Sequence, residues 1–211
     1  MVNEKIKSIV IILVSVIVLS LTVLFQRTES FMVDFGLTTL SFFIIIGGSV
    51  LAKKVAAYSF EADITTKFWE FYRYGFKRGK HLKRPTPMLW LPIILTLFSG
   101  GAFWWMGILE FDVKAKPERV SRRHGLYRFS EMTERHIGRI ALWGVIACLA
   151  LSFAGYLLGL EYFAKLATFY AVWSIIPISS LDGTKIFFGN RGAWTAITIL
   201  TLFFLAAALA I

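Results

Sequence analysis

The chain of 211 residues has one cysteine and few charged residues. Cys148 has no second cysteine for a disulfide, which excludes a disulfide-rich secreted scaffold, and a thiolate zinc site needs several Cys or His residues together. Charged residues make up 17% of the sequence and hydrophobic residues 57%. Soluble domains have about 25% charged residues, so this composition predicts a polytopic membrane protein. Spanning helices need about 20 residues each, so residues 1–211 are predicted to form a single membrane domain.

Sequence motifs of common soluble enzymes are missing as well. The chain has no G-x-S-x-G nucleophile motif and no glycine-rich phosphate loop. Its three histidines are His81, His124 and His136, and none is four residues from another, so an H-E-x-x-H zinc helix is absent. Their positions in basic loops or at the start of a span are typical of surface or interfacial residues rather than of metal ligands.

Apolar runs dominate what remains. Five of them predict spanning helices, at residues 9–25, 35–52, 137–160, 162–181 and 193–211. No small-residue cleavage pattern follows the first run, so residues 1–30 are interpreted as a retained anchor helix rather than a secretory signal. Residues 31–191 then form the core and residues 192–211 the last span. The predicted fold class is an all-α polytopic membrane protein with short strands at the interface.

A sixth apolar stretch, 88–111, is long enough to cross once, but the Ser-Gly-Gly sequence at 99–101 is a turn signal. Residues 53–84 carry nine basic residues and residues 110–139 carry eight. A single crossing would place these basic loops on opposite sides, against the positive-inside rule. We therefore predict a re-entrant hairpin in the plasma membrane, with the amino terminus and both loops in the cytoplasm and the carboxyl terminus outside.

Basic residues of the two loops form a predicted lipid or partner surface, which comprises Lys77, Arg78, Lys80, Lys83, Arg84, Arg122 and Arg123. Aromatic and charged residues alternate in 67–76. Such a stretch is typical of single-stranded nucleic-acid platforms and also of segments at lipid headgroups. Its position between two membrane segments favours the headgroups, so membrane lipids are the expected partners and nucleic acid is not. Residues 111–116 alternate apolar and polar side chains, which predicts a short half-buried strand.

Two ionisable residues of the fourth predicted span, Lys165 inside it and Asp182 directly after its last residue, are functional candidates, because burying a charge in the membrane is costly. Lys165 lies one turn inside the fourth span, close enough to extend its ammonium to the outer surface. Asp182 closes the same span. Periodicity alone interprets Asp182-Gly183 as the end of a helix at the interface.

The residues around Asp182 carry a more specific pattern. P-I-S-S-L-D-G-T-K at 177–185 resembles the N-x-x-P-x-x-x-L-D-G element of the site-2 protease family of intramembrane zinc metalloproteases. K-K-V-A at 53–56 with F-E-A-D at 60–63, and G-R-I-A-L-W-G at 138–144, resemble stretches of archaeal members in the same order. The resemblance covers residues 35–191, and it implies a third zinc ligand at Asp182.

Other residues that the resemblance requires are replaced. The H-E-x-x-H motif would fall on residues 48–52, where Gly48 and Ala52 stand for the two ligands and Ser49 for the general base. Two supporting positions differ as well, with Ser174 in place of Asn and Val145 in place of Pro. Catalytic zinc needs three protein ligands, so neither zinc nor catalysis is expected. Asp182 then needs another partner, such as a water, a backbone amide or Lys185.

The resemblance therefore implies a pseudoprotease, a non-catalytic membrane protein that binds or scaffolds other membrane proteins, as an adaptor or a subunit of a complex. Small residues that let helices approach closely are the candidate packing or partner positions, namely Gly47, Gly48, Ser49, Ala52, Gly100 and Gly101. The alternative is an active intramembrane endopeptidase that uses Cys148, Ser49 or Ser174 near Asp182. A channel or transporter is a third class, disfavoured by the scarcity of intramembrane charge and of broken-helix repeats.

The predicted topology is testable by cysteine labelling. Cysteines introduced by Lys77→Cys and Arg122→Cys, in a Cys148→Ser background, should react with impermeant maleimide from the same, cytoplasmic side in oriented vesicles. Labelling from opposite sides would mean that residues 88–111 cross the membrane completely.

Overall fold

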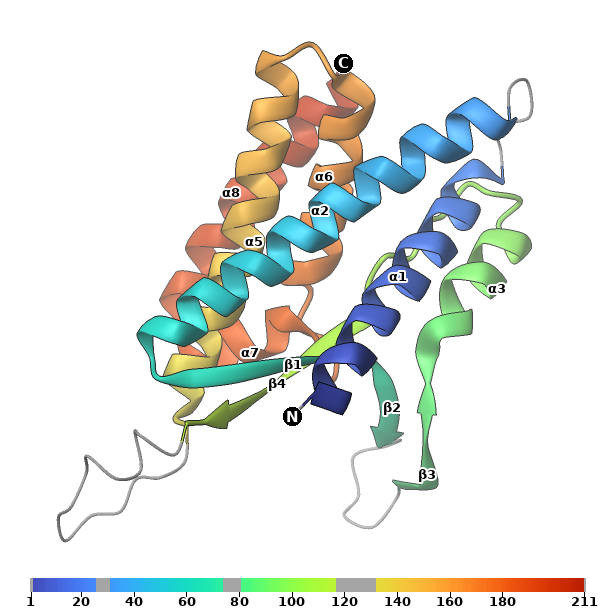
Figure 1. The fold of residues 1–211 in the computed structure, drawn as a ribbon. Coiled ribbons are helices and arrows are strands. Elements are labelled where there is room, and N and C mark those ends of the chain that lie inside the picture. The colour runs from blue at the N-terminus through green and yellow to red at the C-terminus, as the bar shows by residue number, and fades with distance from the viewer. Residues whose placement is uncertain (1, 26–30, 74–80, 117–131, 211) are drawn as a thin grey trace, which may run out of the picture.

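The computed structural model describes residues 2–25, 31–73, 81–116 and 132–210. Helices dominate these residues (Figure 1), as the sequence predicts. Four helices of the described part are long and apolar enough to cross a membrane. They are α1 (Val2–Leu24), α2 (Phe31–Ser59), α5 (Glu134–Leu157) and α8 (Arg191–Ala210). Each overlaps a predicted span and begins a few residues earlier than predicted. Helix α2 also ends later than predicted, at Ser59, whereas α5 ends earlier, at Leu157.

The fourth predicted span is not one helix. Helix α6 (Glu161–Ile175) ends six residues before the predicted end of the span at Leu181, and a separate short helix, α7 (Asp182–Gly189), follows. The break has a local cause, because Pro177 disfavours helical geometry in the residue before it. Ile176 is accordingly extended, with φ −66° and ψ 127°. The prediction of a continuous helix over 162–181 is wrong, and Asp182 begins a helix instead of closing one.

The stretch 88–111 reverses direction at the predicted turn. Helix α3 (Leu91–Phe98), preceded by the 3₁₀ turn η1 (Met88–Trp90), ends at 99–101, where Gly100 and Gly101 have φ values of +60° and +86°. These left-handed conformations favour glycine. The chain then returns without regular structure to strand β4 (Leu109–Ala115), so both ends of the stretch lie at the same end of the molecule (Figure 1).

Two small antiparallel sheets lie at that end. Strand β1 (Ala62–Phe68) pairs with β4, and β2 (Glu70–Arg73) pairs with β3 (His81–Pro87). Trp69 joins them, because its N–H donates to the Ile108 carbonyl at 2.8 Å and its carbonyl accepts from the Met88 N–H at 2.9 Å. The Ser8 hydroxyl of α1 donates to the Thr66 carbonyl of β1 at 3.4 Å. The predicted strand at 111–116 is confirmed as β4, whereas strands β1 to β3 were not individually predicted.

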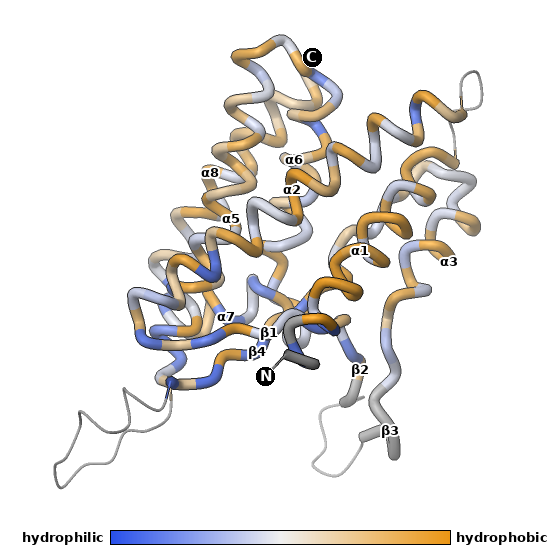
Figure 2. The backbone as a smooth tube through the Cα atoms, viewed as in Figure 1, coloured by the Kyte–Doolittle hydropathy of each residue, from blue (hydrophilic) through white to orange (hydrophobic). Residues whose placement is uncertain are grey.

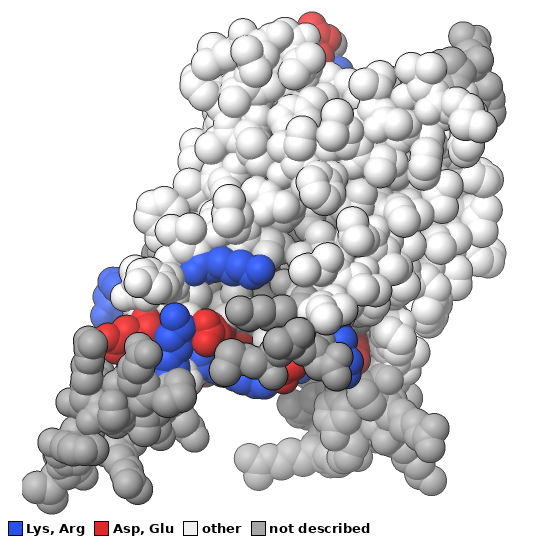
Figure 3. All heavy atoms as spheres, in the orientation of Figure 1, with Lys and Arg blue, Asp and Glu red and all other residues white. Residues whose placement is uncertain are grey.

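Charge separates sharply along the molecule. Hydrophobic residues fill the helical part (Figure 2), while the described charged side chains gather at the end that holds β1 and β4, with a small group at the opposite end (Figure 3). The cross-strand pair Lys67–Asp112 and the pair of Lys114 with Glu4 belong to the charged end. An uncharged belt between polar ends is the pattern of a protein that sits in a bilayer.

Helix α5 is the central packing element, since it contacts α2, α6 and α7. A glycine on α5 allows α7 to pack closely against it. A Cβ atom on Gly138 would come within 2.7 Å of the Lys185 carbonyl oxygen and 3.1 Å of the Gly189 Cα atom. Both are backbone atoms, so the α5–α7 contact depends on glycine at this position.

A matched pair of alanine substitutions tests this contact. Gly138→Ala should lower the free energy of unfolding by about 2 kcal/mol, in the range for overpacking a tight interior. Gly47→Ala is the control, because a Cβ atom there meets nothing within 4 Å, and it should leave stability unchanged or raise it slightly. SDS titration of the purified proteins in mixed micelles measures both. Equal effects would show that the Gly138 contact is loose.

Candidate functional site

The candidate site forms where α7 begins against α2 and α5. Leu181 is the N-cap of α7, and Asp182 stands in its first turn. Gly183 is needed beside Asp182, because a Cβ atom there would clash with the carbonyl groups of Ile175 and Ile176 at the end of α6. The Leu-Asp-Gly sequence thus brings the end of α6 onto the start of α7, where Asp182 is buried.

An ion pair holds the Asp182 carboxylate. The Lys53 ammonium of α2 donates to Oδ2 of Asp182, and only 9% of the lysine side chain and 5% of the aspartate side chain are exposed. The second carboxylate oxygen, Oδ1, is buried and accepts no hydrogen bond from the described residues. A charge pair this deep is stable only because each charge compensates the other.

The Lys53 side chain fits into a space made for it. Gly144 on α5 provides that space, since a Cβ atom there would lie 3.0 Å from Cγ and 3.1 Å from Cδ of Lys53, with Cε closer still. The Phe111 ring of β4 lies beside the ammonium, with 5.1 Å from Nζ to the ring centroid, a distance at which cation–π attraction acts. Ser49, one turn before Lys53, donates to the Gly144 carbonyl at 3.3 Å.

A second lysine and a carboxylate surround this pair. The Lys185 ammonium of α7 donates to the Phe111 carbonyl and lies 3.9 Å from the centroid of the Phe111 ring. Burial lowers the pKa of Lys185, and the nearby Asp182 carboxylate opposes that shift. The Ser180 hydroxyl donates to Glu110, whose pKa is raised by burial. Lys185, suggested by the sequence as a partner of Asp182, therefore contacts Phe111 instead, and Lys53 takes the partner role.

The predicted small-residue positions separate into different environments. Gly48 faces α5, where a Cβ atom would come within 2.8 Å of the Leu151 side chain, whereas Gly47 faces open space. Ser49 is buried, and Ala52 is partly exposed. Gly100 and Gly101 serve the turn of the hairpin rather than helix packing.

The other predicted residues lie apart from the pair or outside the described part. Val145 is buried in the core beside Gly144, and Ser174 is half-buried near the end of α6. The basic residues fall into two groups. Lys77, Arg78, Lys80, Arg122 and Arg123 lie outside the described residues, and Lys83 and Arg84 lie in β3 with side chains that the structure does not describe.

The site does not have the donor set of a zinc centre. Gly48 and Ala52 carry no ligand atom, and Asp182 is engaged by an ammonium. Within the described ranges, no three side chains of His, Cys, Asp or Glu come together. Catalytic zinc takes three protein ligands and an open position, so these residues do not fit the metal that the resemblance implies.

Lys53 was missed as a site residue, because a Lys-Lys pair after an apolar run is a common membrane stop. The signal that identifies it is helical periodicity. The buried face of α2 follows a spacing of three or four residues through Phe42, Ile46 and Ser49, and Lys53 continues this face. Lys54 falls on the exposed side.

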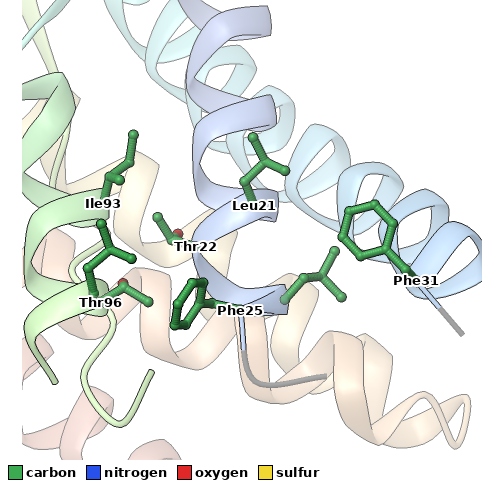
Figure 4. A pocket seen from close by; sticks show the side chains of 8 residues that line it. Leu21, Thr22, Phe25, Phe31, Ile93 and Thr96 are labelled. Atoms are coloured by element: carbon green, nitrogen blue, oxygen red, sulfur yellow. The ribbon is translucent and has the colours of Figure 1, made fainter. Parts of the chain in front are cut away.

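An apolar pocket of about 310 Å³ lies apart from this site, between α1, α2 and α3 toward the end of α1 that faces away from β1 (Figures 1 and 4). Most of the lining residues labelled in Figure 4 are large and apolar, namely Leu21, Phe25, Phe31 and Ile93. The Thr22 hydroxyl in the lining donates to the Leu19 carbonyl of its own helix. The Thr96 hydroxyl, also in the lining, donates to the Phe103 carbonyl at 3.5 Å, so the pocket offers a mainly apolar surface whose two hydroxyl groups are both hydrogen-bonded to backbone carbonyls.

A double-mutant cycle tests the buried pair. Lys53→Met and Asp182→Asn should each lower the free energy of unfolding by about 3–5 kcal/mol, because the remaining partner is left unpaired and buried. The double variant should lose far less than the sum. The exposed pair Lys67–Asp112 is the matched control, with an expected coupling of about 0–1 kcal/mol. Additive losses at Lys53 and Asp182 in SDS titrations would contradict the assignment.

Comparison with known proteins adds no further constraint. No protein-family model, curated protein or solved structure matches this chain. The buried Lys53–Asp182 pair and the sequence motifs around it are therefore the basis on which a function is assigned.

Proposed function

We propose that the protein is a non-catalytic, site-2-protease-like integral membrane protein, a pseudoprotease that binds or scaffolds other membrane proteins. The observation that carries this proposal is the Lys53–Asp182 ion pair. The carboxylate that the resemblance assigns to zinc is neutralised by a side chain of the same protein. An activated water needs a metal or a free base, and the pair supplies neither.

The proposed topology comprises five spans and a re-entrant hairpin, with the amino terminus cytoplasmic in the plasma membrane. Helix α6 has 15 residues, which rise about 22 Å at 1.5 Å per residue. This is less than the hydrocarbon thickness of about 30 Å, so the irregular residues 176–181 complete the fourth span. Support for the hairpin comes from the two sheets, because β1–β4 and β2–β3 pairing holds both of its limbs at the charged end.

A binding role makes use of the helix faces that the protein leaves open. The α2 surface around Gly47 has no neighbour that a Cβ atom would meet, and the apolar Leu51 and Val55 side chains are 63% and 65% exposed. A glycine on the same helix face as large apolar side chains lets another helix approach closely in lipid. This face is the proposed contact for a membrane-protein partner, while the Gly48 side remains occupied by α5.

Metal content and proteolysis together test the proposal. The protein purified from native membranes should contain no stoichiometric zinc by mass spectrometry and should leave unfolded transmembrane substrates uncut. It should instead co-purify with a membrane protein at constant stoichiometry, and Gly47→Leu should weaken that complex, whereas Leu200→Ala on the exposed face of α8 should not.

The opposite result has a clear form. Zinc at one equivalent together with cleavage that Asp182→Asn abolishes, while the exposed Asp112→Asn variant remains active, would identify an intramembrane endopeptidase.

A further inference from the structure

The side chains around Lys53 form a complete cation site that the protein fills itself. Three features converge on the ammonium and its chain: the buried Asp182 carboxylate, the face of the Phe111 ring, and the gap left by Gly144. A carboxylate combined with an aromatic face is the chemistry that binds alkylammonium ions. Each feature comes from a different element, so the site is assembled by the fold and not by one helix.

We infer that Lys53 is a tethered cation, whose ammonium occupies the cation-binding side of Asp182 and thereby excludes divalent metal ions from the site. The inference rests on the proposed function for its premise that a metal would otherwise be expected here. The contacts of Lys53 themselves are independent of that premise.

Exclusion follows from charge and from ligand supply. A divalent ion at Asp182 would lie within a few ångströms of the Lys53 ammonium in a poorly screened interior, where like charges repel strongly. The one remaining oxygen, Oδ1, is a single ligand atom. Lys185 adds another positive charge nearby, and its ammonium donates to the Phe111 carbonyl and forms no ion pair with a carboxylate of the described residues. A metal would therefore have to displace Lys53 and leave its ammonium buried without a counter-charge.

Chemical rescue tests the inference directly. Lys53→Ala removes the atoms from Cγ to Nζ, and n-propylammonium has the same four heavy atoms. The variant should unfold at a lower temperature than the unmodified protein. Millimolar propylammonium should raise the Tm of the variant by about 3 °C, the shift expected in a domain of this size when the free ligand is at roughly ten times its Kd. n-Propanol, of equal size and neutral, should not raise it.

Two further measurements separate charge from packing and from the proposed function. In Lys53→Ala/Asp182→Asn, propylammonium should lose its advantage over n-propanol, because the carboxylate is gone. The unmodified protein should show no Tm shift with Zn²⁺ or Co²⁺ at concentrations that saturate ordinary protein sites, a measurement that needs no variant to fold.

The outcomes are decisive in both directions. Equal effects of propylammonium and n-propanol on Lys53→Ala, or stoichiometric Zn²⁺ or Co²⁺ binding by the unmodified protein, would overturn the tethered cation. If the protein purified from native membranes carried no membrane-protein partner, while the propylammonium and metal measurements came out as expected, the proposed function would be refuted and the tethered cation would stand.

Discussion

Two opposite charges buried among helices determine much of this structure. Removing a carboxylate and an ammonium from water costs several kcal/mol for each ion, and their attraction offsets that cost only in close, well-packed geometry. The protein supplies this geometry from separate elements. Gly144 on α5 makes room for the Lys53 chain, and Gly183 lets α7 start directly beneath the end of α6. The returning limb of the hairpin places Phe111 beside the ammonium. A change in any of these elements would therefore alter the packing around the ion pair.

Much of the fold follows from patterns that act locally along the chain. Long apolar runs specify α1, α2, α5 and α8, since backbone groups in lipid must be satisfied within the helix. The glycines at 100 and 101 identify the reversal, because they tolerate the left-handed conformations that the turn requires. The alternation in 111–116 identifies β4. In each case the determining interaction lies within a few residues, where a sequence pattern can represent it.

The features that sequence patterns did not predict depend on contacts between distant residues. Hydropathy gives no sign that α6 stops at Ile175, although Pro177 provides one in retrospect. Burial of Lys53 depends on Gly144, 91 positions later, and on Asp182, 129 positions later. A charged residue at the end of an apolar run is normally solvated, and only the opposing glycine and carboxylate make burial favourable. The candidate site was thus half predictable, through Asp182, and half dependent on tertiary contacts.

The small β1–β4 sheet illustrates a different kind of protection. Thr66 and Phe111 are opposite one another in its register, and the carbonyl of each accepts a side-chain hydrogen bond, from Ser8 of α1 and from Lys185 of α7. Exposed strand edges are templates for pairing with other chains and for aggregation. Here both edges of the two-stranded sheet are blocked at the Thr66–Phe111 pair, one by Ser8 near the amino terminus and the other by Lys185 near the carboxyl terminus. Pairing of another strand at this position therefore requires α1 or α7 to move away first. The stability of the helical bundle thus also protects the protein against self-association through its sheet.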